Sequence, residues 1–186
     1  MVTLGALWLP ILLSAVLVFF TSFLLHMVLK YHRSDYNPLP NEDAVRAAIR
    51  AGNPPPRQYI LPYCSNPKDM EKPEIKQKYI EGPVGVLTLM RPAAPNMTPM
   101  LVQWFVFVLV ISICLGFVAC HTIDPGVEYM DVFGVVGATG FLAYAAGTVP
   151  AAIWMGKPWS VAIKEVFDGL LYGLVTAGTF GWLWPR

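Results

Sequence analysis

Charged residues are scarce in this chain of 186 residues. Asp, Glu, Lys and Arg make up 13% of the sequence, whereas soluble domains carry roughly 25%. Hydrophobic residues account for 55%, and several long windows hold almost no charge. A run of about 20 apolar residues spans a bilayer core. The shortage of charge therefore excludes an ordinary soluble domain and predicts an all-α, polytopic membrane protein.

Paired cysteines and catalytic motifs are also missing. The three cysteines, Cys64, Cys114 and Cys120, are odd in number and form no C-x-x-C pair, which argues against a disulfide framework. The chain has no nucleophile elbow, zincin motif or phosphate loop. Its net charge is +1 and no basic stripe is present, so a nucleic-acid partner is excluded. No cofactor is predicted, and an enzyme is the function least favoured.

Four apolar windows predict four transmembrane helices. Breaks at Pro125-Gly126 and Gly156-Lys157-Pro158 separate the later windows, and Pro150 is expected to kink the third helix. The predicted order is transmembrane helix 1 at 1–29, a proline-rich segment at 30–99, helix 2 at 100–121, a short outer loop at 122–129, and a hairpin of helices 3 and 4 at 130–186.

The distribution of Lys and Arg predicts the orientation of these helices. With four spans, twelve of the 13 basic residues fall on one side, and Arg186 is the exception. The positive-inside rule places that side in the cytoplasm and both termini on the outer side. All six tryptophans fall near predicted span ends, as interfacial anchors do. The expected location is a bacterial inner (plasma) membrane.

The proline-rich cytoplasmic segment holds twelve of the 17 prolines, so long helices are excluded there. One short helix is expected in NEDAVRAAIRAG, capped by Asn41 and ended by Gly52. Two apolar runs, QYILPY and GPVGVLTLM, are candidates for short strands. These pieces are too few for a core of their own. The segment is therefore expected to lie on the helix bundle and lipid headgroups, or to dock a partner subunit.

Small residues recur at four-residue spacing in the two C-terminal windows. Such spacing lines one side of a helix and lets two backbones approach closely in lipid. The sequence predicts that these ridges pack the hairpin together, with contact to another subunit as the alternative. The predicted helix-packing residues are Gly169, Gly173, Ala177 and Gly181 in one helix, and Ala143, Gly147 and Ala151 in the other.

Ionisable residues begin the last apolar window, in WSVAIKEVFDGLLYG. Lys164 can snorkel to the interface or pair with Asp168 four residues on. Asp168 lies about 12 Å inside the helix at 1.5 Å per residue, where an unpaired carboxylate is costly. Tyr172, Thr176 and Thr179 continue along its face. The sequence predicts an interfacial ion pair or a possible intramembrane polar site at Lys164, Asp168, Tyr172 and Thr176.

Metal binding has only weak support in the sequence. His121, Asp124 and Glu128 gather donor atoms near the outer loop, but their spacing matches no standard ligand run. His26 and His121 fall at opposite ends of their spans, so they cannot bracket one haem. No metal site is predicted.

These features favour an accessory or assembly subunit of a larger membrane complex. It would be non-catalytic and would dock through glycine-rich helix faces and the cytoplasmic segment. The expected partners are the lipid bilayer and other membrane subunits or further copies of the chain. The alternative function is a small oligomeric transporter or ion-path component that uses Asp168.

Overall fold

The structure is a computed structural model that describes residues 2–185. Met1 and Arg186, the one cation assigned to the outer side, lie outside the described residues. The chain is mostly helical and divides into two compact units. The helical unit comprises Met1–Tyr36, Asn96–Ala152 and Lys157–Arg186, and the proline-rich unit comprises Asn37–Pro95 with Ile153–Gly156. Each unit is described by itself.

The first membrane-length helix changes its winding along its length. It opens with a 3₁₀ turn, η1 (Leu4–Leu7), continues as α1 (Trp8–Phe23) and closes with a π-helical turn, η2 (Leu24–Val28). The π turn is defined by the bond from Leu29 N to Leu24 O, 3.0 Å long. π turns inside helices often occur at functional sites, and this one carries His26.

Three further helices complete the helical unit: α4 (Thr98–Thr122), α5 (Tyr129–Ala145) and α7 (Trp159–Trp182). A 3₁₀ turn, η5 (Ala146–Thr148), and the short α6 (Val149–Trp154) extend α5. Pro150 explains this interruption, because its ring blocks the carbonyl four residues earlier, at Ala146. The expected kink therefore falls within the third window.

Within the described residues, three helices are long and apolar enough to cross a membrane: Leu4–Val28, Thr98–Thr122 and Tyr129–Trp154. They coincide with the first three predicted spans. The fourth predicted span coincides with α7, which is as long but holds Lys164, Glu165 and Asp168. Those charges leave α7 outside the apolar set, so the fourth crossing remains a prediction.

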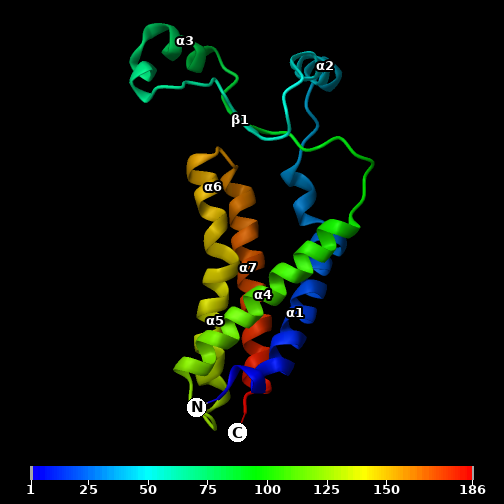
Figure 1. Ribbon diagram of the computed structural model, residues 1–186, viewed down its shortest axis with the longest axis vertical. Helices are drawn as coiled ribbons and strands as arrows, with labels where there is room; N and C mark the ends of the chain where they lie inside the picture. The colour runs from blue at the N-terminus through cyan, green and yellow to red at the C-terminus, as the bar shows by residue number, and fades with distance from the viewer. Residues whose placement is uncertain (1, 186) are drawn as a thin grey trace. The chain divides into compact units, whose positions relative to one another are not determined.

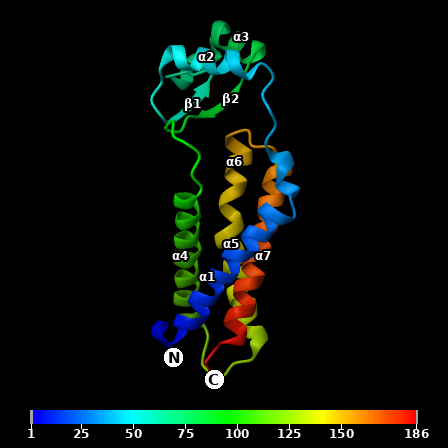
Figure 2. The ribbon, with the colours of Figure 1, turned by 90° about the vertical axis from the view of Figure 1, so that its right-hand side faces the viewer.

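Helices α5 and α7 run side by side and pack closely (Figures 1 and 2). A Cβ built on Gly169 would lie 2.9 Å from the backbone N of Ala145, and one on Gly173 would lie 2.8 Å from the N of Phe141. Gly181 faces the ring of Tyr129, and Ala177 faces Gly137. The α7 ridge therefore packs inside the chain.

The small residues assigned to the partner ridge lie elsewhere. Ala143 and Gly147 are exposed, and no atom outside the local backbone lies within 4 Å of a Cβ built on Gly147. The face of α5 that meets α7 runs through Gly137, Phe141 and Ala145 instead. At 3.6 residues per turn, Ala143 and Gly147 point away from that face, so the prediction for these two residues needs correction. Ala151 lies in α6, beyond the 3₁₀ turn, and its packing role stays a prediction.

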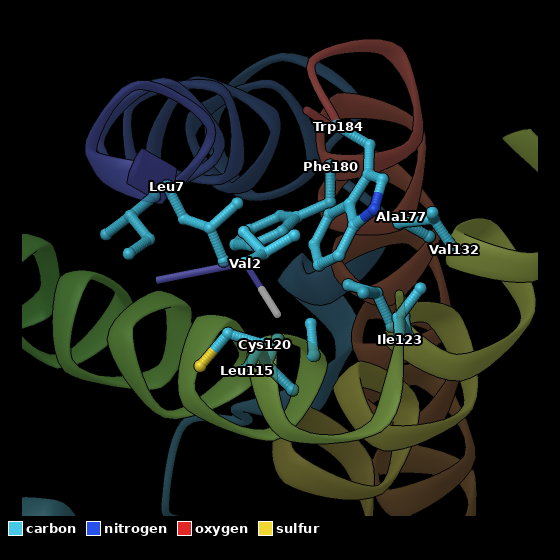
Figure 3. Close-up of a cluster of buried hydrophobic side chains, with 12 residues drawn as sticks. Val2, Leu7, Leu115, Cys120, Ile123, Val132, Ala177, Phe180 and Trp184 are labelled. Atoms are coloured by element: carbon cyan, nitrogen blue, oxygen red, sulfur yellow. The ribbon is translucent and has the colours of Figure 1, made fainter. Parts of the chain in front are cut away.

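A hydrophobic cluster closes one end of the helical unit (Figure 3). Phe180 and Trp184 lie among Leu7 and Leu115, from the first and second membrane-length helices. Trp184 Nε1 donates to the Asp124 carbonyl at 3.0 Å, so this tryptophan belongs to the core of the helical unit. Because Val2 and Trp184 share the cluster, the two ends of the described chain meet at one end of the bundle.

The proline-rich unit contains short elements. These are α2 (Glu42–Gly52), β1 (Gln58–Leu61), η4 (Pro67–Glu71), α3 (Pro73–Glu81) and β2 (Gly85–Thr88). The strands lie in the two apolar runs and pair antiparallel, with Gln58 opposite Thr88. Asn41 precedes α2 but makes no side-chain cap, because its backbone is left-handed with φ at +58°.

Candidate functional site

A cluster of polar side chains forms where the first helix ends. Lys30 adopts a left-handed conformation with φ at +60°, which is uncommon for a residue other than glycine. The chain thereby turns from η2 into a second short turn, η3 (Tyr31–Asp35). The reversal stacks His32 on His26, with ring centroids 4.3 Å apart and planes at 5°. Two imidazoles six positions apart in the sequence thus become neighbours.

His32 lies between two carboxylates. Its Nδ1 is 2.6 Å from Asp35 Oδ2, and its Nε2 is 2.8 Å from Asp168 Oδ2 on α7. An ionised carboxylate only accepts hydrogen bonds. A ring nitrogen that faces an ionised carboxylate therefore donates to it. The ring joins the end of the first helix to the middle of the last.

Asp168 is almost fully buried, with 4% of its side chain exposed. Its Oδ1 accepts a hydrogen bond from the Tyr31 hydroxyl, and its Oδ2 faces His32. A buried carboxylate without such partners would cost several kcal/mol. These contacts explain how α7 carries an acid eight residues past Ser160.

Lys164 completes the network from one turn away on α7. Its Nζ donates to Asp35 Oδ1 at 2.5 Å, and to Tyr31 O and Ser34 Oγ at 2.8 Å each. Burial alone would raise the pKa of Asp35, but hydrogen bonds and charge from Lys164 and His32 outweigh burial and lower that pKa. Asp35 is therefore ionised at neutral pH.

His26 is the accessible member of the cluster, with 46% of its side chain exposed. Its Nδ1 lies 3.0 Å from the Ser22 carbonyl, the geometry of an Nδ1–H donor. Its Nε2 then carries a lone pair and lies 3.7 Å from Asp168 Oδ2. His26, His32 and Asp168 place their ligand atoms within 4.8 Å of one another.

An open pocket of about 290 Å³ lies beside this cluster. Its wall combines both imidazoles with the ion pair of Lys157 and Glu165. A polar pocket against a buried acid can admit water, ions or small polar ligands. The lining residues are His26, His32, Asp35, Tyr36, Lys157, Pro158, Val161 and Glu165.

The predicted polar site is only partly assembled. Lys164 pairs with Asp35 and not with Asp168, because the long lysine side chain reaches back toward the helix end. Thr176 donates to the Tyr172 carbonyl at 2.8 Å and so offers nothing to Asp168. Thr179 likewise donates to the backbone, at Val175.

Three buried polar atoms, grouped around Tyr172 of α7, lack a hydrogen-bond partner among the described residues. They are the Tyr172 and Tyr144 hydroxyls and the indole N–H of Trp104. The rings of Tyr144 and Trp104 lie 5.6 and 5.9 Å from that of Tyr172. Three helices thus bring unsatisfied polar groups to one place inside the bundle.

The outer-loop candidates do not gather. Among residues 2–185, His121, Asp124 and Glu128 form no group with ligand atoms close enough to share an ion. His121 Nδ1 instead lies 2.7 Å from the Phe117 carbonyl, on its own helix. The Cys120 thiol lies beside it, with Sγ 3.2 Å from that nitrogen.

His26, Tyr31, His32 and Asp35 were missed by sequence reasoning. The predicted topology offered one clue. If the first and last spans run antiparallel, the C-terminal end of the first helix and Asp168 lie at a similar depth in the membrane. The local chain reversal at Lys30 had no signal, because no Gly or Pro marks it.

Comparison of the chain with protein-family models, with curated proteins and with solved structures finds no match.

Proposed function

We propose that this chain is a non-catalytic accessory or assembly subunit of a larger membrane complex. It docks through the proline-rich unit. The observation that supports this role is that each of residues 37–95, all of them described, is exposed or half-buried. Helices and strands without a buried side chain lack the hydrophobic core that stabilises an independent domain. The unit therefore needs a surface that completes it.

Apolar side chains on the unit supply the contact area. The apolar face of α2 is open, with Val45 38% exposed. Large apolar residues elsewhere are more exposed still: Ile60, Tyr63, Ile80, Val84 and Met90. Basic and acidic groups are mixed along the same stretch, which disfavours an anionic lipid surface as the main ligand. The occupant is the extramembrane face of another protein subunit.

The proposed setting is a bacterial inner membrane crossed four times, with α7 as the fourth span. The contacts of Asp168 support this crossing, because they reduce the cost of its charge. An even number of spans agrees with the shared cluster of Val2 and Trp184. The proline-rich unit then lies in the cytoplasm, and both termini lie outside.

The experiment is native electrophoresis of the tagged chain after mild-detergent extraction from its own membranes. We expect co-migration with defined subunits at fixed stoichiometry. Ile80→Asp and Met90→Asp should abolish it while leaving membrane insertion intact. Asp43→Asn, at a side chain 99% exposed, is the matched control and should co-migrate normally. A wild-type chain that runs alone, or Asp variants that still co-migrate, would contradict the role.

A second candidate function is an ion-path component. It is favoured by buried Asp168 and the unsatisfied groups of Tyr172, Tyr144 and Trp104, since such groups can relay protons or ions within a membrane. Proton flux into liposomes loaded with the purified protein tests it. Asp168→Asn should remove the flux and Thr179→Ala should retain it. Flux that survives Asp168→Asn would exclude the path.

A further inference from the structure

We propose that His26, His32 and Asp168 form a binding site for a divalent first-row transition-metal ion of the Zn²⁺ class. Two imidazole nitrogens and one carboxylate oxygen are a ligand set typical of such ions. The site does not depend on a partner subunit, because all its residues belong to the helical unit.

The distances fit a small ion. Ligands at 2.0–2.1 Å from a tetrahedral metal lie about 3.3 Å from one another. Asp168 Oδ2 is 2.8 Å from His32 Nε2 and 3.7 Å from His26 Nε2, so the two distances bracket that value. Because the two rings are stacked, binding would require the exposed His26 ring to rotate out of the stack toward the ion. The ion would take the place of the proton between His32 and Asp168.

The second shell gives independent support. A metal-binding histidine usually donates its other ring N–H to a carbonyl or carboxylate, which fixes the tautomer and aims the free nitrogen. Both imidazoles follow this rule: Nδ1 of His26 faces the Ser22 carbonyl, and Nδ1 of His32 faces Asp35. Both Nε2 atoms lie within 3.7 Å of the same oxygen of Asp168. A simple ion pair requires only one histidine and does not explain the arrangement of His26.

The fourth coordination position faces solvent. His26 and His32 line the open pocket of about 290 Å³, which has room for a water ligand. Three protein ligands with one open position are the pattern of exchangeable or reactive zinc sites rather than closed structural ones. The two acids that line the pocket, Asp35 and Glu165, are paired with Lys164 and Lys157, which leaves Asp168 as the anionic ligand.

The test is Co²⁺ titration of the purified full-length protein in mild detergent, followed by Zn²⁺ competition. Co²⁺ reports its ligand geometry through visible absorption. We expect one Co²⁺ per chain, displaced by Zn²⁺. His26→Ala should weaken Zn²⁺ binding at least tenfold without unfolding the protein, because this side chain is half-exposed. Asp35→Asn keeps all three ligands but removes the carboxylate that faces His32 Nδ1 and Lys164, and should weaken binding about 10–100-fold.

The matched control removes Cys120 and His121, a histidine–thiol pair outside the proposed site. A Cys120→Ser, His121→Ala double variant should bind Zn²⁺ as the wild type does. Unchanged affinity in His26→Ala, loss of binding in the control variant, or no Co²⁺ absorption would each overturn the site. Recovery of the membrane complex is measured separately, so failure of the metal site and failure of the accessory role are distinguishable.

Discussion

At the scale of single residues, Asp35 organises the polar cluster although it is not a metal ligand in our assignment. Its carboxylate accepts a hydrogen bond from Lys164 on α7 and faces the neighbouring His32 ring. Only 4% of the Asp35 side chain is exposed. Loss of one partner of a buried pair leaves the other charge uncompensated. Substitution of Asp35 should therefore destabilise the contact between η3 and α7.

We expect Asp35→Asn to lower the free energy of unfolding by about 3 kcal/mol at pH 7. The pKa of Asp35 is lowered in the folded protein, so its contribution is fully present above the unfolded pKa of about 3.9. It is lost as pH falls through the lower, folded pKa. The stability gap between wild type and variant should therefore be constant near neutral pH and close only below about pH 4. Thermal unfolding in mild detergent measures this gap.

Asp43→Asn serves as the control for this measurement. Its side chain is 99% exposed, and its nearest cation, Arg46, is 3.7 Å away. Exposed pairs of this kind contribute little, so the control should unfold with the wild type. A gap between wild type and Asp35→Asn that already closes near pH 6 would contradict the lowered pKa.

At the scale of elements, the close contact of α5 and α7 predicts opposite outcomes for two glycines. A Cβ added at Gly169 would meet Ala145 at 2.8–2.9 Å, and overpacking of this kind costs about 1–3 kcal/mol. A Cβ at Gly147 meets nothing within 4 Å. Alanine there should leave stability unchanged or raise it by up to about 1 kcal/mol. Unfolding of Gly169→Ala and Gly147→Ala in detergent compares them, and equal effects would refute the packing face.

Ser14 and Ser112 link the first two membrane-length helices. Ser14 Oγ donates to Ser112 Oγ at 3.2 Å, and both residues are fully buried. Interhelical hydrogen bonds in membranes contribute about 0.6 kcal/mol on average. A double-mutant cycle of Ser14→Ala and Ser112→Ala should give a coupling energy near this value. A coupling indistinguishable from zero would mean that Ser14 bonds only its own helix, at Pro10 O.

Several elements followed from composition. Long apolar windows predicted the first three membrane-length helices, and four-residue glycine spacing predicted the packing face of α7. The facing side of α5 was assigned wrongly, since small size alone does not tell which stripe meets a neighbour. The polar cluster escaped prediction for a related reason: it depends on the turn at Lys30, which places η3 against α7. Long-range contacts of that kind leave no local pattern.

At the scale of the whole molecule, topology gives a direct prediction. In a Cys114→Ser, Cys120→Ser background, Cys64 should react with an impermeant maleimide only after cells are opened, because we propose that the basic side faces the cytoplasm. Pro185→Cys, added to a variant that also lacks Cys64, should react in intact cells if α7 crosses the membrane. Labelling of Cys64 from outside would invert the orientation. Protection of Pro185→Cys in intact cells would mean three crossings.

The contact between η3 and α7 can form only late in biosynthesis, because α7 is the last helix to be translated. A ribosome delivers Tyr31, His32 and Asp35 well before Lys164 and Asp168, which belong to the last helix. Until α7 is made, the His32 imidazole and the Asp35 carboxylate have no partner from that helix. Nascent chains that end before α7 should therefore turn over faster than full-length ones. Addition of the final helix then brings Lys164 to the Asp35 carboxylate, which was made early in synthesis.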